Sequence, residues 1–185
     1  MRLILLGAPG SGKGTQAVFL AERLGVPAIS TGEMLRAAVE AGSELGKKVE
    51  AIMTTGELVD DATMADVVRE RLAQDDAAGG FVLDGYPRTL GQADTLATIL
   101  NEKNWSLNVV VHIEVPEEEL IQRALARQRA DDQEEVIRQR QKVYRQQTQP
   151  LIDHYQAQGV LCAIDGHQAI DEVAKTVAAA LEVTR

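Results

Sequence analysis

The sequence predicts an α/β fold, a three-layer α/β/α sandwich in which helices cover both faces of a five-stranded parallel sheet. Short apolar runs recur along the chain without polar alternation, as expected for strands that are buried on both faces. Amphipathic helical segments separate these runs, and helices between parallel strands form right-handed crossovers. The expected strands are residues 3–6, 26–29, 81–83, 109–113 and 160–164.

The expected helices follow from apolar residues at helical spacing. The first helix follows Lys13, and Gly25 ends it. Residues 30–75 hold helical or turn-like signals but no strand, so we expect a small helical excursion there that can move as a unit. The apolar stripes are Ala17, Leu20, Ala21 and Leu24 in the first helix, Ile137, Tyr144, Leu151 and Tyr155 in a later one, and Ile170, Val173, Ala174, Val177 and Leu181 in the last.

Length and composition limit the class of protein. The chain has 185 residues, 45% of them hydrophobic, and a formal net charge of -9. This length fits one domain, and the acidic balance argues against a general nucleic-acid binder. We expect no membrane span, because the apolar runs are short. We also expect no secretory signal, because MRLILLGAPG runs into Gly and Lys without a small-residue cleavage site. The single cysteine, Cys162, excludes an internal disulfide, so we expect a cytoplasmic protein.

A glycine-rich loop joins the first strand to the first helix. Residues 7–15 read GAPGSGKGT, the spacing of a phosphate-binding loop. Glycines there let backbone N–H groups approach phosphate oxygens, and the helix N-terminus adds partial positive charge. Lys13 supplies a point charge for the β- and γ-phosphates. The general motif places a hydroxyl directly after the lysine, but here Gly14 follows Lys13 and the hydroxyl comes at Thr15. The loop therefore predicts nucleotide binding more directly than it predicts ligation of magnesium by this hydroxyl.

Asp84 ends the third expected strand and therefore lies at the same sheet edge as the glycine-rich loop. Beside such a loop, a carboxylate is a candidate magnesium ligand, direct or through water. The alternative is a turn or helix-capping aspartate in the segment Asp84-Gly85-Tyr86-Pro87. We favour the metal role.

Arginines are concentrated over residues 123–145 although the chain is acidic overall. Arg140 falls on or beside the inward face of its helix, where it needs either a phosphate or a buried carboxylate, and we favour phosphate. Arg123 and Arg127 share one helix face, and Arg36 and Arg88 lie near turns after strands. Several arginines facing a phosphate loop suggest phosphoryl transfer between two phosphorylated substrates.

Taken together, five motifs make the chain resemble an adenylate kinase over nearly its whole length. They are GAPGSGKGTQ at 7–16, STGEMLR at 30–36, GELV at 56–59, FVLDGYPRT at 81–89 with Gln92, and RADDQEEVIRQR at 129–140. Their order is typical of nucleoside monophosphate kinases. The resemblance implies a P-loop NTPase-like fold and the reversible reaction of Mg·ATP with AMP to give two ADP, which maintains adenine nucleotide balance.

The resemblance also implies a role for individual residues. Those that act in transfer would be Lys13, Arg88, Arg123, Arg129 and Arg140. Those that hold ATP would be Gly10, Ser11, Gly12, Lys13, Gly14, Thr15, Arg123, Arg127 and Gly166. Those that hold AMP would be Thr31, Arg36, Glu57, Leu58, Val59, Gly85, Tyr86, Pro87, Arg88, Gln92, Arg129 and Arg140, with Gln92 reading the adenine edge. Asp84 would hold Mg²⁺, through water.

By the same resemblance, residues 1–185 form one domain with two mobile parts. The core would be residues 1–29, 60–125 and 133–185, the AMP-binding flap 30–59, and a short lid 126–132. The lid is the short type and has no cysteines for structural zinc. Three residues depart from the usual pattern: Glu33 replaces Asp, Asp60 replaces Pro and caps the helix that begins near Asp61, and Gln128 replaces Gly.

Two other functions remain open from the sequence. One is a kinase for another monophosphate, UMP or CMP, because acceptor selectivity rests on few contacts. The other is a nucleotide-binding sensor without turnover, and the intact set of charged residues argues against it. The expected partners are ATP, AMP and ADP, with no nucleic acid or membrane, and the expected state is a monomer.

Overall fold

The computed structural model describes residues 1–127 and 132–183, and its centre is a five-stranded parallel sheet in the order β2-β3-β1-β4-β5. The prediction of a five-stranded parallel sheet is confirmed, and each strand begins and ends within two residues of its expected position. The strands are β1 (Arg2–Leu6), β2 (Ala28–Ser30), β3 (Phe81–Asp84), β4 (Val109–Glu114) and β5 (Leu161–Asp165).

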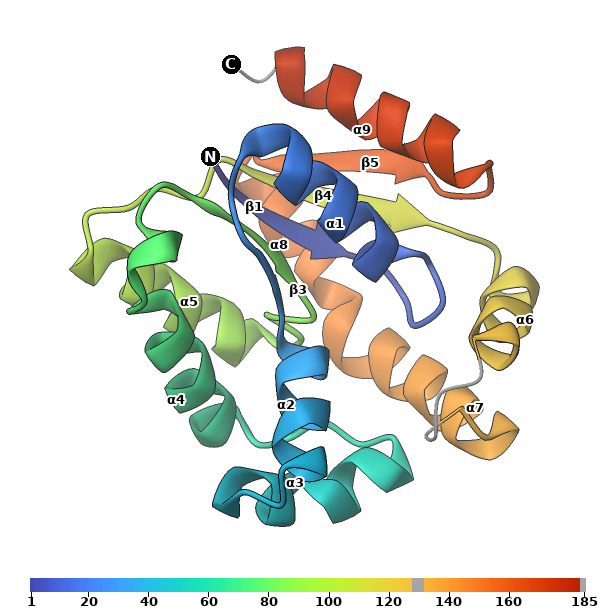
Figure 1. Cartoon of the computed structure of the whole chain (residues 1–185). Helices are drawn as coiled ribbons and strands as arrows, with labels where there is room; N and C mark the ends of the chain where they lie inside the picture. The colour runs from blue at the N-terminus through green and yellow to red at the C-terminus, as the bar shows by residue number, and fades with distance from the viewer. Residues whose placement is uncertain (128–131, 184–185) are drawn as a thin grey trace.

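Helices cover both faces of the sheet, which confirms the three-layer architecture (Figure 1). One face is covered by α1 (Lys13–Leu24) and α9 (Ile170–Val183), and the other by α4 (Asp61–Leu72), α5 (Leu90–Glu102) and α8 (Pro150–Ala157). The remaining elements are α2 (Thr31–Glu40), α3 (Glu44–Thr55), η1 (Asp75–Ala77), α6 (Glu117–Ala126), α7 (Glu134–Val143) and η2 (Tyr144–Thr148).

Alternate residues of each strand point to opposite faces of the sheet and pack in two separate hydrophobic clusters. On β1, Leu3 and Leu5 pack with α1 and α9, whereas Ile4 and Leu6 pack with the helices of the opposite layer. All four side chains are buried, which explains why this strand reads as a continuous apolar run.

The second strand is two residues later at its start than expected, at 28–30 instead of 26–29. The amide of Val26 donates to the carbonyl of Ala21 and so closes the end of α1. Pro27 has no N–H to donate to a neighbouring strand. Ladder pairing with β3 therefore begins only at Ala28, opposite Val82.

The prediction of one continuous stripe over residues 137–155 is wrong at its centre. Helix α7 passes into a π-helical turn, η2, and Pro150 begins a new helix because its ring cannot donate the next helical hydrogen bond. Ile137, Leu151 and Tyr155 are buried as expected. Tyr144 falls in the turn, is only half-buried, and turns its hydroxyl toward His112 Nε2 at 3.4 Å.

The helical excursion between the second and third strands is formed by α2 and α3, which project away from the sheet, and by α4 (Figure 1). On the other side of the sheet's carboxyl edge lie α6 and α7 (Figure 1). Helices thus flank the edge at which ligands bind in parallel α/β folds.

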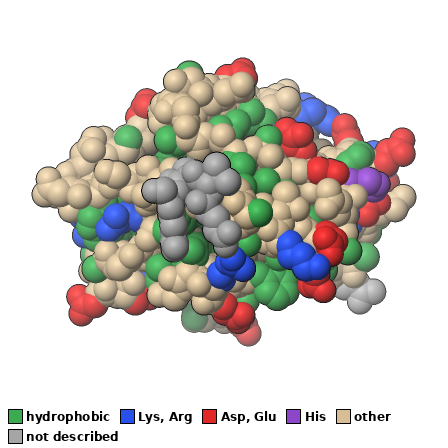
Figure 2. Space-filling model, turned by 90° about the horizontal axis from the view of Figure 1, so that it is seen from above, with side chains coloured by type: hydrophobic (Ala, Val, Ile, Leu, Met, Phe, Trp, Pro, Cys, Tyr) green, Lys and Arg blue, Asp and Glu red, His purple; other side chains and the backbone are tan. Residues whose placement is uncertain are grey.

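The face shown in Figure 2 carries acidic and basic side chains of the described residues interspersed with hydrophobic ones. Among the described residues, none of the helices has the length and apolar character that crossing a bilayer would require.

Candidate functional site

A cavity of about 960 Å³ opens at the carboxyl edge of the sheet. Its volume lies within the range of small-molecule sites. Of the residues expected to hold ligands, it is lined by Gly10, Ser11, Gly12, Lys13, Gly14, Thr15, Thr31, Arg36, Glu57, Leu58, Val59, Asp84, Gly85, Pro87, Arg88, Gln92, Arg123, Arg127, Arg140 and Gly166. Residues that are far apart in the sequence therefore share one cavity.

Two residues of the predicted set stand apart. The side chain of Tyr86 is 1% exposed and packs in the core instead of lining the cavity, because the turn after β3 directs it inward. Arg129 lies outside the described residues.

The glycine-rich loop runs from β1 into α1, which begins at Lys13 with Gly12 as its N-cap. Gly10 and Gly12 both have φ of +92°, in the left-handed region that favours glycine. A Cβ at Gly10 would also collide with the carbonyl of Leu120 at the start of α6. The loop can thus lie against α6 only because this residue is glycine.

Lys13 lies within this loop. Its Nζ donates to the carbonyls of Gly7 at 2.6 Å and Ala8 at 3.0 Å. Burial lowers the pKa of Lys13 to about 8; the charge of Asp84 opposes this shift, and the charges of Arg88 and Arg127 add to it. A lysine in such surroundings gains most from an anion, which would restore the stability of its charged form.

Asp84 ends β3 beside the loop and is 9% exposed. Its Oδ2 accepts from Ser30 Oγ at 3.3 Å, and its backbone carbonyl accepts from Thr31 Oγ1 at 3.4 Å. Its Oδ1 is buried and has no hydrogen-bond partner among the described residues. A buried carboxylate oxygen without a partner is a place where a cation or its bound water gives stabilisation.

Three arginines from different elements converge on the wall formed by the β3–α5 turn. Arg88 Nε donates to the carbonyl of Gly85 at 2.8 Å. Burial lowers the pKa of Arg88, Asp84 opposes this shift, and the like charges of Arg140 and Arg36 add to it. Cations that repel one another in a cavity favour an anionic ligand.

A second group of cations lies on the α6 side. Arg123 Nε donates to Glu119 at 2.8 Å, and its NH1 donates to the carbonyl of Gly166 at 3.1 Å. Gly166 follows β5, as expected from the sequence. The arginine thereby ties α6 to the loop after the last strand.

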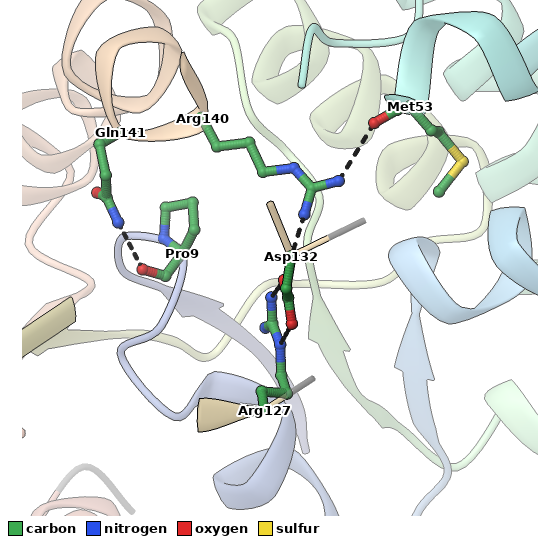
Figure 3. Close-up of polar contacts among 6 residues, drawn as sticks. All are labelled: Pro9, Met53, Arg127, Asp132, Arg140 and Gln141. Atoms are coloured by element: carbon green, nitrogen blue, oxygen red, sulfur yellow. Dashed lines mark hydrogen bonds and ion pairs between the residues drawn. The ribbon is translucent and has the colours of Figure 1, made fainter. Parts of the chain in front are cut away.

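Figure 3 shows that the carboxylate of Asp132 lies between Arg127 and Arg140. It accepts two hydrogen bonds from Arg127, at 2.9 and 2.6 Å, and lies 4.0 Å from Arg140 NH1. Arg140 NH2 also donates to the carbonyl of Met53 at the end of α3, at 3.3 Å. Of the two partners weighed for Arg140, the structure shows a carboxylate, that of Asp132. The favoured partner, a phosphate, stays a prediction for this residue of the cavity wall.

Sequence reasoning missed two buried polar side chains that shape the site. Gln141 is 3% exposed, and its Nε2 donates to the carbonyl of Pro9 at 2.7 Å, which ties α7 to the glycine-rich loop (Figure 3). Thr148 donates to the carbonyl of Arg88 at 2.8 Å. A polar residue on an otherwise apolar helix face was the available signal, but it names no partner.

Gln92, by contrast, was expected to face a base, and it lines the cavity while being 2% exposed. Its Oε1 accepts from the backbone N–H of Arg88 at 2.8 Å. Its Nε2 donates to Asp61 Oδ1 at 2.8 Å. Both ends of the amide are thus anchored within the protein.

Comparison with known proteins gives consistent results. Residues 5–160 match the family model described as adenylate kinase. An adenylate kinase of Synechococcus sp. (strain RCC307) is 52% identical over an alignment that covers 97% of this chain and 98% of the relative. The adenylate kinase of Trichlorobacter lovleyi is 47% identical, with 98% and 99% covered, and that of Nocardia farcinica is 50% identical, with 94% of each covered.

Proposed function

The chain belongs to the adenylate kinase family, which transfers a phosphoryl group between ATP and AMP, and we propose that the cavity at the carboxyl edge of its sheet holds both nucleotides during this reaction. The observation that carries this proposal is that the glycine-rich loop and two separate groups of arginines line the same space. A hydrolase needs one phosphate site, whereas a transfer between nucleotides needs two that meet. The family assignment does not favour a UMP or CMP kinase.

We assign the ATP phosphates to the glycine-rich loop and to the α6 side of the cavity. Backbone N–H groups at the start of α1, together with Lys13, would hold the β- and γ-phosphates. Arg123 and Arg127 lie on α6 and at its end, on the side of the loop where Gly10 approaches Leu120. Gly166 would contact the ATP base through its backbone.

We assign AMP to the opposite wall. Arg36 and Arg88 would hold its phosphate, with Arg140 between the two sites and Arg129 assigned by resemblance. Thr31, the backbone of residues 57–59 and the 85–88 turn would hold the sugar and base. Tyr86 contributes to this turn through its backbone, since its side chain is in the core.

Asp84 is the residue that would hold Mg²⁺ in this cavity, through water. The partnerless buried Oδ1 of this carboxylate fits that role, and Mg²⁺ commonly binds through one carboxylate plus water and substrate phosphates. When bound, Mg²⁺ neutralises charge on the phosphate oxygens. Asp84 itself remains anchored by Ser30, which fixes where its other oxygen points.

The chain's own contribution to the reaction is alignment and electrostatic stabilisation. The acceptor is already a phosphate oxygen, so no covalent nucleophile is required. Lys13, Arg88 and Arg140 place fixed positive charge around the transferring group, where it stabilises developing negative charge without reorganisation. Residues 30–59 as a flap and 126–132 as a lid, of which 128–131 lie outside the described residues, would close over the cavity and exclude water. A monomeric state and a cytoplasmic location stay predictions.

The test is a coupled assay of ADP formation from ATP and AMP, with Mg²⁺ and with EDTA. We expect ADP formation that requires both nucleotides and falls to background with EDTA. A protein that hydrolyses ATP equally well without AMP would contradict the transfer reaction. Tight binding of a two-adenosine polyphosphate without turnover would contradict catalysis and indicate a sensor.

A pH dependence follows from the environment of Lys13. Its pKa of about 8 in the free protein means that Lys13 is charged below this pH and neutral above it. Phosphates favour the charged form, so ATP binding must take up a proton above pH 8. We expect the Kd for ATP to rise above pH 8 by up to about tenfold per pH unit.

Titration calorimetry checks this expectation. Measured at pH 8.5 in two buffers of different ionisation enthalpy, the apparent binding enthalpies should differ, whereas at pH 7 the part that depends on Lys13 should vanish. The Lys13→Met variant provides the control, because it lacks the titrating amine. Equal proton uptake by the variant and the wild type would show that another group titrates.

A further inference from the structure

The side-chain amide of Gln92 makes two hydrogen bonds within the protein, and one of its partners, Asp61, lies outside the cavity. Asp61 is exposed at the first position of α4 and is not part of the cavity wall. Its Oδ1 accepts from Gln92 Nε2, and both of its oxygens lie within 3.2 Å of the hydroxyl of Thr89, which donates to them. Thr89 Oγ1 in turn accepts from the backbone N–H of Gln92 at 3.1 Å.

These partners allow one orientation of the Gln92 amide. A carboxylate only accepts hydrogen bonds, and the backbone N–H of Arg88 only donates. The observed orientation sets the NH₂ group toward Asp61 and the oxygen toward Arg88. The opposite orientation would place two acceptors against each other at Asp61 and two donors against each other at Arg88.

The arrangement leaves a defined pattern for a ligand. The Gln92 amide can make two more hydrogen bonds, because Nε2 has a second N–H and Oε1 has a second lone pair. Adenine can use both: its 6-amino group donates to the lone pair on Oε1, and its N1 accepts from the N–H on Nε2. Hypoxanthine and guanine present the reverse, an acceptor at O6 and a donor at N1.

We propose that Asp61 is a positioning residue that determines base specificity: together with the backbone N–H of Arg88, it fixes the orientation of Gln92 so that the acceptor site accepts adenine and rejects 6-oxopurines. This proposal rests on the proposed function, because it takes the Gln92 side of the cavity as the AMP site. Packing also supports it, since a Cβ at Gly91 would lie only 3.0 Å from Asp61 Oδ2. The glycine therefore leaves room for the carboxylate between α4 and α5.

The test compares AMP with IMP, which differs from AMP only in having the 6-oxo group and the N1 proton. In Asp61→Asn the side chain keeps its shape, but one oxygen becomes an NH₂ group, so residue 61 can accept from Gln92 in its present orientation or donate to a reversed Gln92. We expect the ratio of kcat/KM for AMP to kcat/KM for IMP to fall about tenfold, the effect of one hydrogen bond. AMP should lose efficiency while IMP gains it.

The neighbouring carboxylate supplies a matched control. Asp60 caps α4 through the backbone N–H of Thr63 at 2.9 Å, a bond that asparagine also makes. Asp60→Asn therefore makes the same change of charge one residue away, and the AMP to IMP ratio should stay within twofold. CMP serves as a second control, since a loosened site would admit it and a reversed amide would not.

Different failures have different meanings. A wild-type protein that forms no ADP from AMP would overturn the proposed function. A wild-type protein that prefers AMP to IMP, with an Asp61→Asn variant that keeps the same preference, would overturn the role of Asp61. If Asp61→Asn does not fold, Asp61→Ser makes the same comparison, because its hydroxyl both donates and accepts and serine suits a helix start.

Discussion

Replacing Lys13 with methionine is expected to lower kcat for ADP formation about a thousandfold, a loss of roughly 4 kcal/mol in transition-state stabilisation. Lys13 is the cation at the start of α1 inside the glycine-rich loop, and methionine keeps the apolar stem but removes the charge. The charge that develops on the transferring group then loses a fixed partner. Steady-state assay of ADP formation at saturating ATP and AMP measures the effect.

The fold should survive this change. Because burial lowers the pKa of Lys13, the folded state disfavours its charged form at neutral pH, and removal of the charge relieves that cost. We expect a Tm equal to or above that of the wild type. The control is Lys175→Met, since Lys175 is exposed on α9 and pairs with Glu172 of its own helix. A Lys13→Met variant with the activity of Lys175→Met would contradict the assignment of the phosphate loop.

The strands of this fold could be predicted because each is an apolar run bounded by a glycine or a polar turn. Their order in the sheet could not. The handedness of crossovers restricts the topology, but the placement of β3 between β2 and β1 depends on which faces the helices cover. Both faces of β1 are equally apolar, so its sequence does not distinguish them.

In the candidate site too, some features could be predicted from the sequence and others could not. The glycine-rich loop is contiguous, so its chemistry can be read from residues 7–15. Contacts between distant residues cannot be read in this way: Gln141 and Pro9 are 132 positions apart, and Gln92 and Asp61 are 31 apart. Each is polar and each has several possible partners. Only the packing of α7 on the loop and of α4 on α5 selects among them.

Arg140 lies between these cases. Its helical phase beside Ile137 predicted an inward position, and it is confirmed as a residue of the cavity wall. Its neighbours were not predicted, because Asp132 precedes α7 and Met53 lies on α3, 87 positions earlier in the chain. Periodicity gives the direction of a side chain but not the groups that it meets.

Truncation of Arg88 to alanine is expected to lower kcat/KM for AMP about a hundredfold or more, with a change of less than about threefold in the Kd for ATP. Arg88 lies on the wall opposite the glycine-rich loop, and its guanidinium contacts only the Gly85 carbonyl among the hydrogen bonds of the described residues. Its backbone N–H and carbonyl hold Gln92 and Thr148, and the substitution leaves both bonds in place. The loss should therefore fall on the phosphate of the acceptor and not on the framework.

Arg138→Ala is the matched control, because Arg138 is 61% exposed on α7 and pairs with Glu134 of the same helix. Removing it should leave both substrates unaffected. Calorimetry with ATP and steady-state kinetics with varied AMP separate the two sites for Arg88→Ala. An equal loss of affinity for ATP and of kcat/KM for AMP would mean that Arg88 contacts the phosphates of both nucleotides. Arg88 would then be shared by the ATP and AMP sites and not specific to the AMP site.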